Sequence, residues 1–244
     1  MARAKLLIVN ADDFGFTRGV NDGIVEAHRN GILTAATLMA TGAAFDHAVE
    51  LARRTASLDV GVHLVLVGGP GQPRTIAQLL RAVALGRVRI YEELDAQIRR
   101  VLAAGLHPTH LDTHKHTHLL PPVLDAVARL SREHGIRWVR RPLNVPWLTG
   151  RLRKQGCLLT DRFAGFRLTG KFDTRELVGF LDNMPLGLTE FMCHPGYCTD
   201  ELRAEATRLK ESRARELEAL VARETREAVE RNGVILRNYR DCQW

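Results

Sequence analysis

The sequence of 244 residues lacks the marks of several protein classes. No segment approaches the roughly 20 consecutive apolar residues that span a membrane. Four cysteines are present but form no Cys-x-x-Cys pair, so free thiols in a reducing compartment are expected. The glycine-rich run 68–71 is not followed by Lys-Ser/Thr, and is therefore a loop rather than a phosphate-binding P-loop. Internal repeats, low-complexity tracts and linkers are also missing, which favours a single domain over residues 1–244.

The N-terminal segment has a basic start followed by a short apolar run that ends at Asn10-Ala11-Asp12-Asp13. This run is too short for the core of a signal peptide. We therefore expect the first strand of a cytoplasmic protein.

The chain is basic, with a formal net charge of +7, and much of the excess lies in residues 137–154. This segment holds six basic residues, Arg140 among them, no acidic residue, and Trp138 and Trp147. Nucleic acid is not expected as a partner, because no nucleic-acid-binding motif occurs. Basic side chains beside tryptophans would suit peripheral contact with an anionic membrane. A solvated basic surface, with the tryptophans in the core, is the simpler explanation.

Apolar, β-rich runs alternate with helical patterns along the whole chain. Strands are predicted at residues 5–10, 32–40, 59–67, 108–114, 136–141, 189–194 and 234–239. Helices are predicted at residues 17–30, 45–55, 76–85, 92–104, 121–134, 174–183 and 201–232, whereas 143–169 has no regular pattern. This alternation is typical of parallel βαβ units and predicts an α/β fold, either a doubly wound sheet or a (β/α) barrel.

Residues 109–118 read Thr-His-Leu-Asp-Thr-His-Lys-His-Thr-His and hold four of the ten histidines. If the run is extended, alternate side chains project to one face; these are His110, Asp112, His114, His116 and His118. Each buried polar group without a partner costs roughly 1–3 kcal/mol, so a core cannot absorb this set cheaply. A divalent metal ion is the compensation that the pattern favours.

Acidic and imidazole side chains also follow other predicted strands. Asp12 and Asp13 come after the first strand, His63 lies in the third, and His194 follows a late one. In α/β barrels the active site lies at the carboxyl ends of the strands. A hydrolytic metal site takes three such ligands and leaves a position for water. One of the two aspartates, His63 and a histidine of 114–118 would supply the ligands, and the second aspartate would act as base.

Each feature has a structural explanation when taken alone. Paired aspartates after a strand often cap turns, and a histidine in an apolar strand is often a hydrogen-bonded core residue. Two other functions fit the same ligands. One is a non-haem iron oxygenase with a facial triad, and the other is a catalytically inactive metal-binding, membrane-associated protein.

As a set, these motifs resemble those of the YdjC/ChbG-like carbohydrate deacetylases. The resemblance rests on residues 9–15 (Val-Asn-Ala-Asp-Asp-Phe-Gly), 61–64 (Gly-Val-His-Leu), 109–118 and 192–196 (Met-Cys-His-Pro-Gly). It extends to residues 238–241 and thus covers nearly the whole chain. The run 112–118 followed by Leu-Leu-Pro-Pro is most similar to the hopanoid-biosynthesis-associated branch called HpnK.

The resemblance implies a distorted (β/α) barrel of the polysaccharide-deacetylase type and the removal of N-acetyl groups from amino sugars. It implies Asp13, His63 and His114 as metal ligands and Asp12 as general base. His194 would protonate the leaving amine or stabilise the oxyanion. Further positions expected around the ligands or the substrate are Asp112, His116, His118 and Arg140. By ligand preference the ion is zinc, cobalt or nickel, whereas the family resemblance adds magnesium.

The branch resemblance implies N-acetylglucosamine linked to a hopanoid lipid as substrate, with the protein in the cytoplasm and peripheral at the inner membrane surface. Segment 137–154 would then touch that membrane. Lys115 stands where chitooligosaccharide-type members usually carry histidine, which argues against a soluble chitooligosaccharide. That substrate is the alternative.

Overall fold

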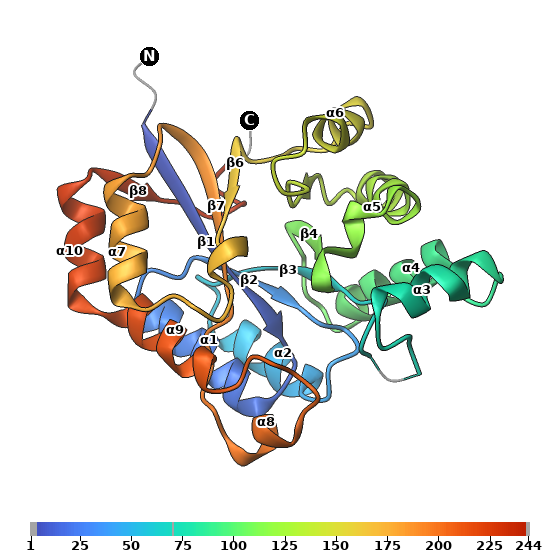
Figure 1. Ribbon diagram of the computed structural model, residues 1–244, viewed down its shortest axis with the longest axis horizontal. Coiled ribbons are helices and arrows are strands. Elements are labelled where there is room, and N and C mark those ends of the chain that lie inside the picture. The colour runs from blue at the N-terminus through green and yellow to red at the C-terminus, as the bar shows by residue number, and fades with distance from the viewer. Residues whose placement is uncertain (1–3, 70, 243–244) are drawn as a thin grey trace.

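The computed structural model describes residues 4–69 and 71–242, whose central feature is a curled sheet of parallel strands (Figure 1). The strand order is β5-β4-β3-β2-β1-β7-β6, and β8 pairs with the first residues of β1. The strands are β1 (Lys5–Phe14), β2 (Ala35–Leu38), β3 (Asp59–Leu64), β4 (His110–Thr113), β5 (Trp138–Val139), β6 (Arg162–Ala164), β7 (Gly187–Cys193) and β8 (Val234–Leu236). The sheet stays open between β5 and β6. An isolated parallel bridge joins Trp138 of β5 to Leu158, which precedes β6. The expected distorted (β/α) barrel is thus confirmed as a curled half-barrel.

Helices cover the outer face of this sheet (Figure 1). The long helices are α1 (Arg18–Asn30), α2 (Phe45–Arg54), α3 (Ile76–Ala84), α4 (Ile90–Ala103), α5 (Pro121–Glu133), α6 (Pro146–Lys154), α7 (Thr174–Asp182), α9 (Glu211–Val221) and α10 (Arg223–Arg231). Shorter ones are η1 (His114–Leu119), η2 (Phe166–Leu168) and α8 (Asp200–Ala204). Thr17 caps the N-terminus of α1, since its hydroxyl accepts a hydrogen bond from the backbone N–H of Val20 at 3.2 Å. None of the helices in the described part of the chain is both long enough and apolar enough to cross a membrane.

Alternation along the strands separates two environments. On β1, Leu7, Val9 and Ala11 pack into the large apolar core shared with the helices, whereas Ile8 belongs to a second, smaller cluster. That smaller cluster comprises Ile8, Ala35, Trp138, Leu188, Tyr239 and Cys242. Buried polar residues come two positions after its strand members, on the strand or directly after it, namely Asn10, Thr37, Arg140 and Glu190. The inside of the curl therefore changes from apolar to polar toward the carboxyl ends of the strands.

Strand β1 is irregular at its carboxyl end. Its register with β2 shifts between Ala11 and Phe14. Asp13 has a φ of 67°, in the left-handed region that a non-glycine residue rarely adopts. This twist lets two consecutive aspartates serve one site, because a regular strand would send Asp12 and Asp13 to opposite faces.

Two predicted segments were wrong. Residues 143–169 were expected to be irregular but contain α6, β6 and η2. Gly156 follows α6 and Gly165 precedes η2, and both adopt positive φ. The predicted helix 201–232 is divided into α8, α9 and α10, with a break at Ala222.

Candidate metal centre

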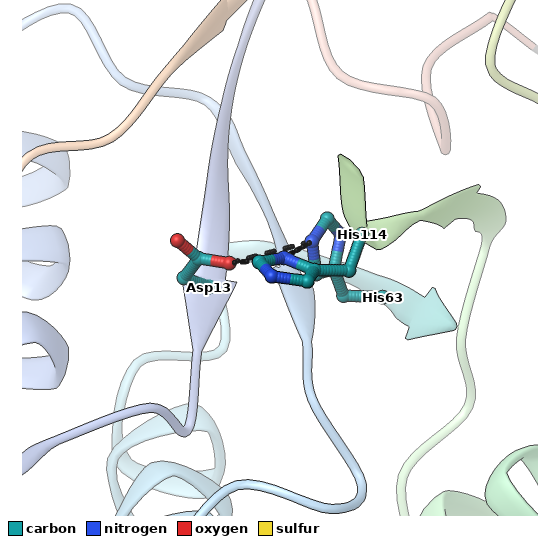
Figure 2. Close-up of side chains that lie close together, drawn as sticks. All are labelled: Asp13, His63 and His114. Atoms are coloured by element: carbon teal, nitrogen blue, oxygen red, sulfur yellow. Dashed lines mark hydrogen bonds and ion pairs between the residues drawn. The ribbon is translucent and has the colours of Figure 1, made fainter. Parts of the chain in front are cut away.

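Three side chains from three strand ends converge on one point (Figure 2). Asp13 ends β1, His63 lies in β3 and His114 directly follows β4. Oδ1 of Asp13 lies 3.4 Å from Nε2 of His63 and 3.1 Å from Nδ1 of His114. The two imidazole nitrogens are 3.2 Å apart. These are the three residues that the sequence predicted as ligands, and the structure brings them together.

The spacing of these atoms fits a divalent metal. Two ligand atoms that each lie about 2.1 Å from a tetrahedral ion are roughly 3.4 Å from one another. Oδ1 of Asp13 is buried and has no hydrogen-bond partner within residues 4–69 and 71–242, as expected for an atom left to bind an ion. The side chain of His114 is 23% exposed, against 1% for His63, so the site opens to solvent beside His114.

Asp112 orients His63 from behind. Its Oδ1 lies 2.7 Å from Nδ1 of His63, and its Oδ2 accepts a hydrogen bond from the hydroxyl of Thr37 at 3.0 Å. A carboxylate at Nδ1 keeps the proton there and leaves the lone pair of Nε2 facing the centre. Burial lowers the pKa of His63, but the charges of Asp112 and Asp12 outweigh burial and raise it to about 10. Without a metal, His63 therefore holds a proton where the ion would bind.

Asp13 is held from the other side by Arg213 of α9, whose Nη2 donates to Oδ2 at 2.6 Å. Both side chains are almost completely buried. Burial raises the pKa of the Asp13 carboxyl, but the charge of Arg213 together with the contacts to His114 and His63 holds the pKa well below the usual value. Asp13 is therefore ionised, with Oδ2 bound to Arg213 and Oδ1 facing the two imidazoles.

Arg140 lies at the centre of a second group of carboxylates. Its guanidinium donates to both oxygens of Asp12, at 2.6 and 2.7 Å, and to Glu190 at 2.7 Å. It also lies 2.8 Å from Asp112. Asp12, His63 and Asp112 are close enough together to hold an ion, but this guanidinium already occupies the space between the two carboxylates. The group around Asp13 is therefore the better metal site.

Asp12 and His194 face each other beside the metal centre. Oδ2 of Asp12 lies 4.0 Å from Nε2 of His194. Burial raises the pKa of Asp12, but Arg140 outweighs it and keeps Asp12 ionised at all ordinary pH values. Burial lowers the pKa of His194 to about 4, despite the opposing charges of Asp12 and Asp13. His194 is thus neutral at pH 7, and Nδ1 of its ring has no hydrogen-bond partner in the described part of the chain.

The prediction that residues 110–118 alternate on one face was wrong beyond Thr113. The chain leaves β4 there and enters a tight turn in which Lys115 and His116 have φ of 53° and 52°. His118 folds back, and its Nδ1 lies 2.6 Å from the hydroxyl of Thr113. His116 lies against the rings of Phe163 and Phe166. Of the histidines in this run, only His114 belongs to the metal centre.

His110 has a structural role beneath the site. Its ring stacks on Tyr239 with centroids 3.9 Å apart, and Nε2 lies 2.9 Å from the side-chain oxygen of Asn10. This is the hydrogen-bonded core histidine that the simpler interpretation of such residues describes.

Segment 137–154 does not form one basic surface. Trp138 and Arg140 are buried inside the curl. Arg151 forms a bidentate ion pair with Asp125, at 2.6 Å for both contacts. Trp147, in contrast, is 59% exposed on α6. Trp138 and Arg140 are therefore not available to a membrane, whereas Arg137, Arg153 and Lys154 are exposed, and membrane contact through this segment stays a prediction.

Sequence reasoning missed Arg213 and Glu216, which lay in a stretch interpreted only as a charged helix. Both side chains are 1% exposed. A signal was present: Arg213, Glu216, Leu217 and Leu220 follow the i, i+3, i+4, i+7 spacing of a buried helical face. Charged residues on an apolar face indicate buried partners.

Comparison with known proteins gives consistent matches. Residues 6–231 match the family described as YdjC-like protein. A carbohydrate deacetylase of Brevibacillus brevis is 37% identical over 240 residues, covering 91% of this chain and 94% of that protein. A carbohydrate deacetylase of Clostridium beijerinckii is 32% identical over 250 residues, covering 96% and 99%.

Solved structures agree on the fold. A crystal structure from Enterococcus faecalis V583, of a protein assigned by inference to cellobiose-phosphate cleavage, superposes with a TM-score of 0.84 at 28% identity, covering 99% of this chain and 100% of that one. A family 4 carbohydrate esterase from Streptomyces lividans, in complex with acetate, has a TM-score of 0.51 at 11% identity, covering 96% and 93%, and shares the fold. With this architecture, and with the family match over almost its whole length, the chain belongs to the YdjC-like family.

Proposed function

We propose that this protein is a metal-dependent carbohydrate deacetylase, which hydrolyses the amide bond of an acetamido sugar. The observation that carries the proposal is the convergence of the Asp13 carboxylate and the imidazoles of His63 and His114 on one point. Asp12 and His194 lie beside this centre, where proton transfer is needed. The names of the two bacterial relatives, both carbohydrate deacetylases, support the same reaction.

Asp13, His63 and His114 would hold one divalent ion. Two imidazoles and one carboxylate suit zinc, cobalt or nickel, and magnesium is retained because of the family resemblance. When bound, such an ion polarises the acetyl carbonyl and lowers the pKa of water. Because the site opens beside His114, the substrate enters from that side.

Asp12 is the proposed general base. Arg140 holds both of its oxygens, so the carboxylate is fixed in orientation and always ionised. A water that attacks the acetyl carbon gives one proton to Asp12 and, when the C–N bond breaks, that proton must reach the amine. His194 is neutral at pH 7 and 4.0 Å from Asp12, so we assign it the relay of that proton to the amine. The products are acetate and the free amino sugar.

The finer proposal concerns the substrate, an N-acetylglucosamine unit on a membrane lipid of the hopanoid class. A surface near the site supports it. Between Asp59 and Glu92 the chain has no acidic residue but four arginines. In this stretch α3 has one buried residue, Leu79, whereas Leu80 and Leu85 are 49% and 53% exposed. Exposed leucines beside arginines suit the surface of an anionic bilayer.

The loop that leads into α3 lies beside the side chain of Lys115. A Cβ added at Gly68 would lie 3.3 Å from Nζ of Lys115, the residue that follows His114. We propose that a lipid-linked sugar held at α3 extends past Lys115 to the open side of the site. This surface adds to segment 137–154 in the proposal, in which Trp147 of α6 is 59% exposed and Arg137, Arg153 and Lys154 are exposed as well.

Acetate release from a panel of substrates tests the proposal. The panel contains chitobiose, longer chitooligosaccharides and lipid-linked N-acetylglucosamine in vesicles, each with and without chelator. We expect chelator-sensitive release, highest for the lipid-linked sugar. Preference for chitobiose would establish the soluble alternative. Metal binding without release from any acetamido sugar would establish the inactive protein. Oxygen consumption with ferrous ion would establish the oxygenase.

Co-sedimentation with vesicles tests the lipid surface separately. Leu80→Glu/Leu85→Glu should abolish binding to vesicles that contain anionic lipid, and Leu102→Glu on α4, also partly exposed, is the matched control. Equal, negligible binding of the wild-type protein to neutral and anionic vesicles would remove the membrane contact from the proposal.

A further inference from the structure

Helix α9 inserts two charged side chains beneath the site, one helical turn apart. Arg213 and Glu216 are each 1% exposed, whereas their neighbours Arg215 and Glu218 are exposed. A buried charge is retained only with good partners. The partners of these two residues are parts of the site, and the deacetylase mechanism above gives neither residue a role.

Arg213 acts on Asp13. Its Nη2 donates to Oδ2 of Asp13 at 2.6 Å, and its Nε donates to the carbonyl of Leu209 at 3.2 Å. Asp13 has the left-handed φ of 67°, and a non-glycine residue keeps such a conformation only where its surroundings enforce it. The guanidinium fixes the carboxylate so that Oδ2 is occupied and Oδ1 alone faces His63 and His114.

Glu216 acts on His194 through the backbone. Its Oε2 accepts a hydrogen bond from the N–H of His194 at 2.6 Å, and its Oε1 accepts one from the N–H of Gly170 at 2.8 Å. Both oxygens are thus used by backbone donors of two loops. The loop after β7 is also tied to the helix by the N–H of Gly196, which donates to the carbonyl of Arg213 at 3.2 Å.

We propose that Arg213 and Glu216 are positioning residues of the deacetylase site, Arg213 for the metal ligand Asp13 and Glu216 for the proton relay His194. One turn of α9 would thus hold both Asp13, at the end of β1, and His194, directly after the neighbouring strand β7. The inference rests on the proposed function, but the part that concerns Arg213 depends on metal binding alone.

Substitutions of the two residues should affect different properties, metal affinity for Arg213 and turnover for Glu216. Arg213→Met should weaken zinc binding by about 10- to 100-fold, the usual effect of losing an outer partner of a ligand. Arg213→Lys keeps the positive charge but lacks the planar guanidinium, so it should recover part of that zinc affinity. Glu216→Gln offers one acceptor where two are needed, so it should lower kcat by about tenfold or more, with zinc affinity and KM unchanged.

The experiment measures zinc affinity by chelator competition, and kcat and KM by acetate release, for these variants and two controls. Arg215→Met and Glu218→Gln lie on the exposed face of the same helix and should match the wild type. Glu216→Gln placed in a His194→Ala background should cause no further loss of kcat, because its effect passes through His194. Thermal unfolding measures the folded fraction, to which all values are normalised.

Wild-type zinc affinity in Arg213→Met would overturn the role of Arg213. An equal loss of kcat from Glu216→Gln with and without His194 would overturn the role of Glu216, and show that it serves stability only. If the wild-type protein binds zinc but releases no acetate, the proposed function fails while the result for Arg213 still stands.

Discussion

Oδ1 of Asp112 lies 2.7 Å from Nδ1 of His63, and this contact turns the other nitrogen of the ring toward Asp13 and His114. The two residues come from adjacent strands, β3 and β4, in which His63 is the direct partner of Asp112. The register of the sheet therefore fixes the orientation of a metal ligand. Ligand histidines in proteins are commonly held by a carboxylate in this way.

Replacing Asp112 should weaken metal binding. In Asp112→Asn the amide nitrogen would face Arg140 or Thr37, and the proton on His63 would no longer be held at Nδ1 by a full charge. We expect a loss in zinc affinity of about 10- to 100-fold, measured by competition with a chromogenic chelator. Affinity equal to that of the wild type would show that the ring orientation does not depend on this carboxylate.

Replacing Asp12 should separate catalysis from metal binding. Asp12→Asn keeps the size of the side chain beside Arg140 but removes the base. Turnover should fall by about 10²- to 10⁴-fold, the usual contribution of a general base. Zinc stoichiometry, measured by atomic absorption, should stay unchanged. Undiminished acetate release in this variant would assign the base elsewhere.

The metal-free protein should lose stability as the pH rises. The pKa of His63 is raised to about 10 by Asp112 and Asp12 acting against burial, whereas a histidine of the unfolded chain titrates near 6.5. The protonated ring therefore stabilises the fold fully below about pH 6.5, and this contribution disappears as the pH rises through about 10. Urea unfolding of chelator-treated protein between pH 6 and 10 measures it, with His63→Gln as the control that lacks the effect.

The same proton must leave when the ion binds, so zinc affinity should rise with pH over this range. Calorimetry in buffers of different ionisation enthalpy counts the protons released. No proton release at pH 8 would mean that His63 is already neutral in the metal-free site.

The two tryptophans of segment 137–154 should differ in their effect on stability. Trp138 is 5% exposed and packs with Tyr239 inside the curl, whereas Trp147 is 59% exposed. Trp138→Ala should lower the free energy of unfolding by about 3–5 kcal/mol, and Trp147→Ala by less than about 0.5 kcal/mol. Chemical denaturation measures both. Equal effects would contradict the assignment of Trp138 to the core.

Much of the site was predictable because parallel strands end at one edge. Asp13, His63 and His114 each follow or end an apolar run, and the topology alone brings such positions together. The polar residues two positions after inward-facing apolar ones, such as Asn10 after Ile8, follow the same alternation. Local patterns therefore sufficed for most of the strands and for the positions that could supply ligands. The choice of Asp13 and His114 among them came from the family resemblance, and β6 was missed.

The remainder depends on contacts distant in sequence. The turn that moves His116 and His118 away from the metal centre requires positive φ at two consecutive residues, Lys115 and His116. Neither is a glycine, so the sequence gives no signal for this turn. The bidentate contact of Arg140 with Asp12 joins residues 128 positions apart, and that of Arg213 with Asp13 joins residues 200 apart. From sequence alone, the basic segment 137–154 and the charged helix 201–232 are expected to lie in solvent. Only the tertiary fold shows which of their charged side chains are buried.

Crystals soaked with zinc and measured at the zinc absorption edge test the central claim most directly. We predict one anomalous peak per chain, about 2.0–2.2 Å from Oδ1 of Asp13, Nε2 of His63 and Nδ1 of His114. A peak between Asp12 and Asp112 instead, or no peak at saturating zinc, would contradict the account.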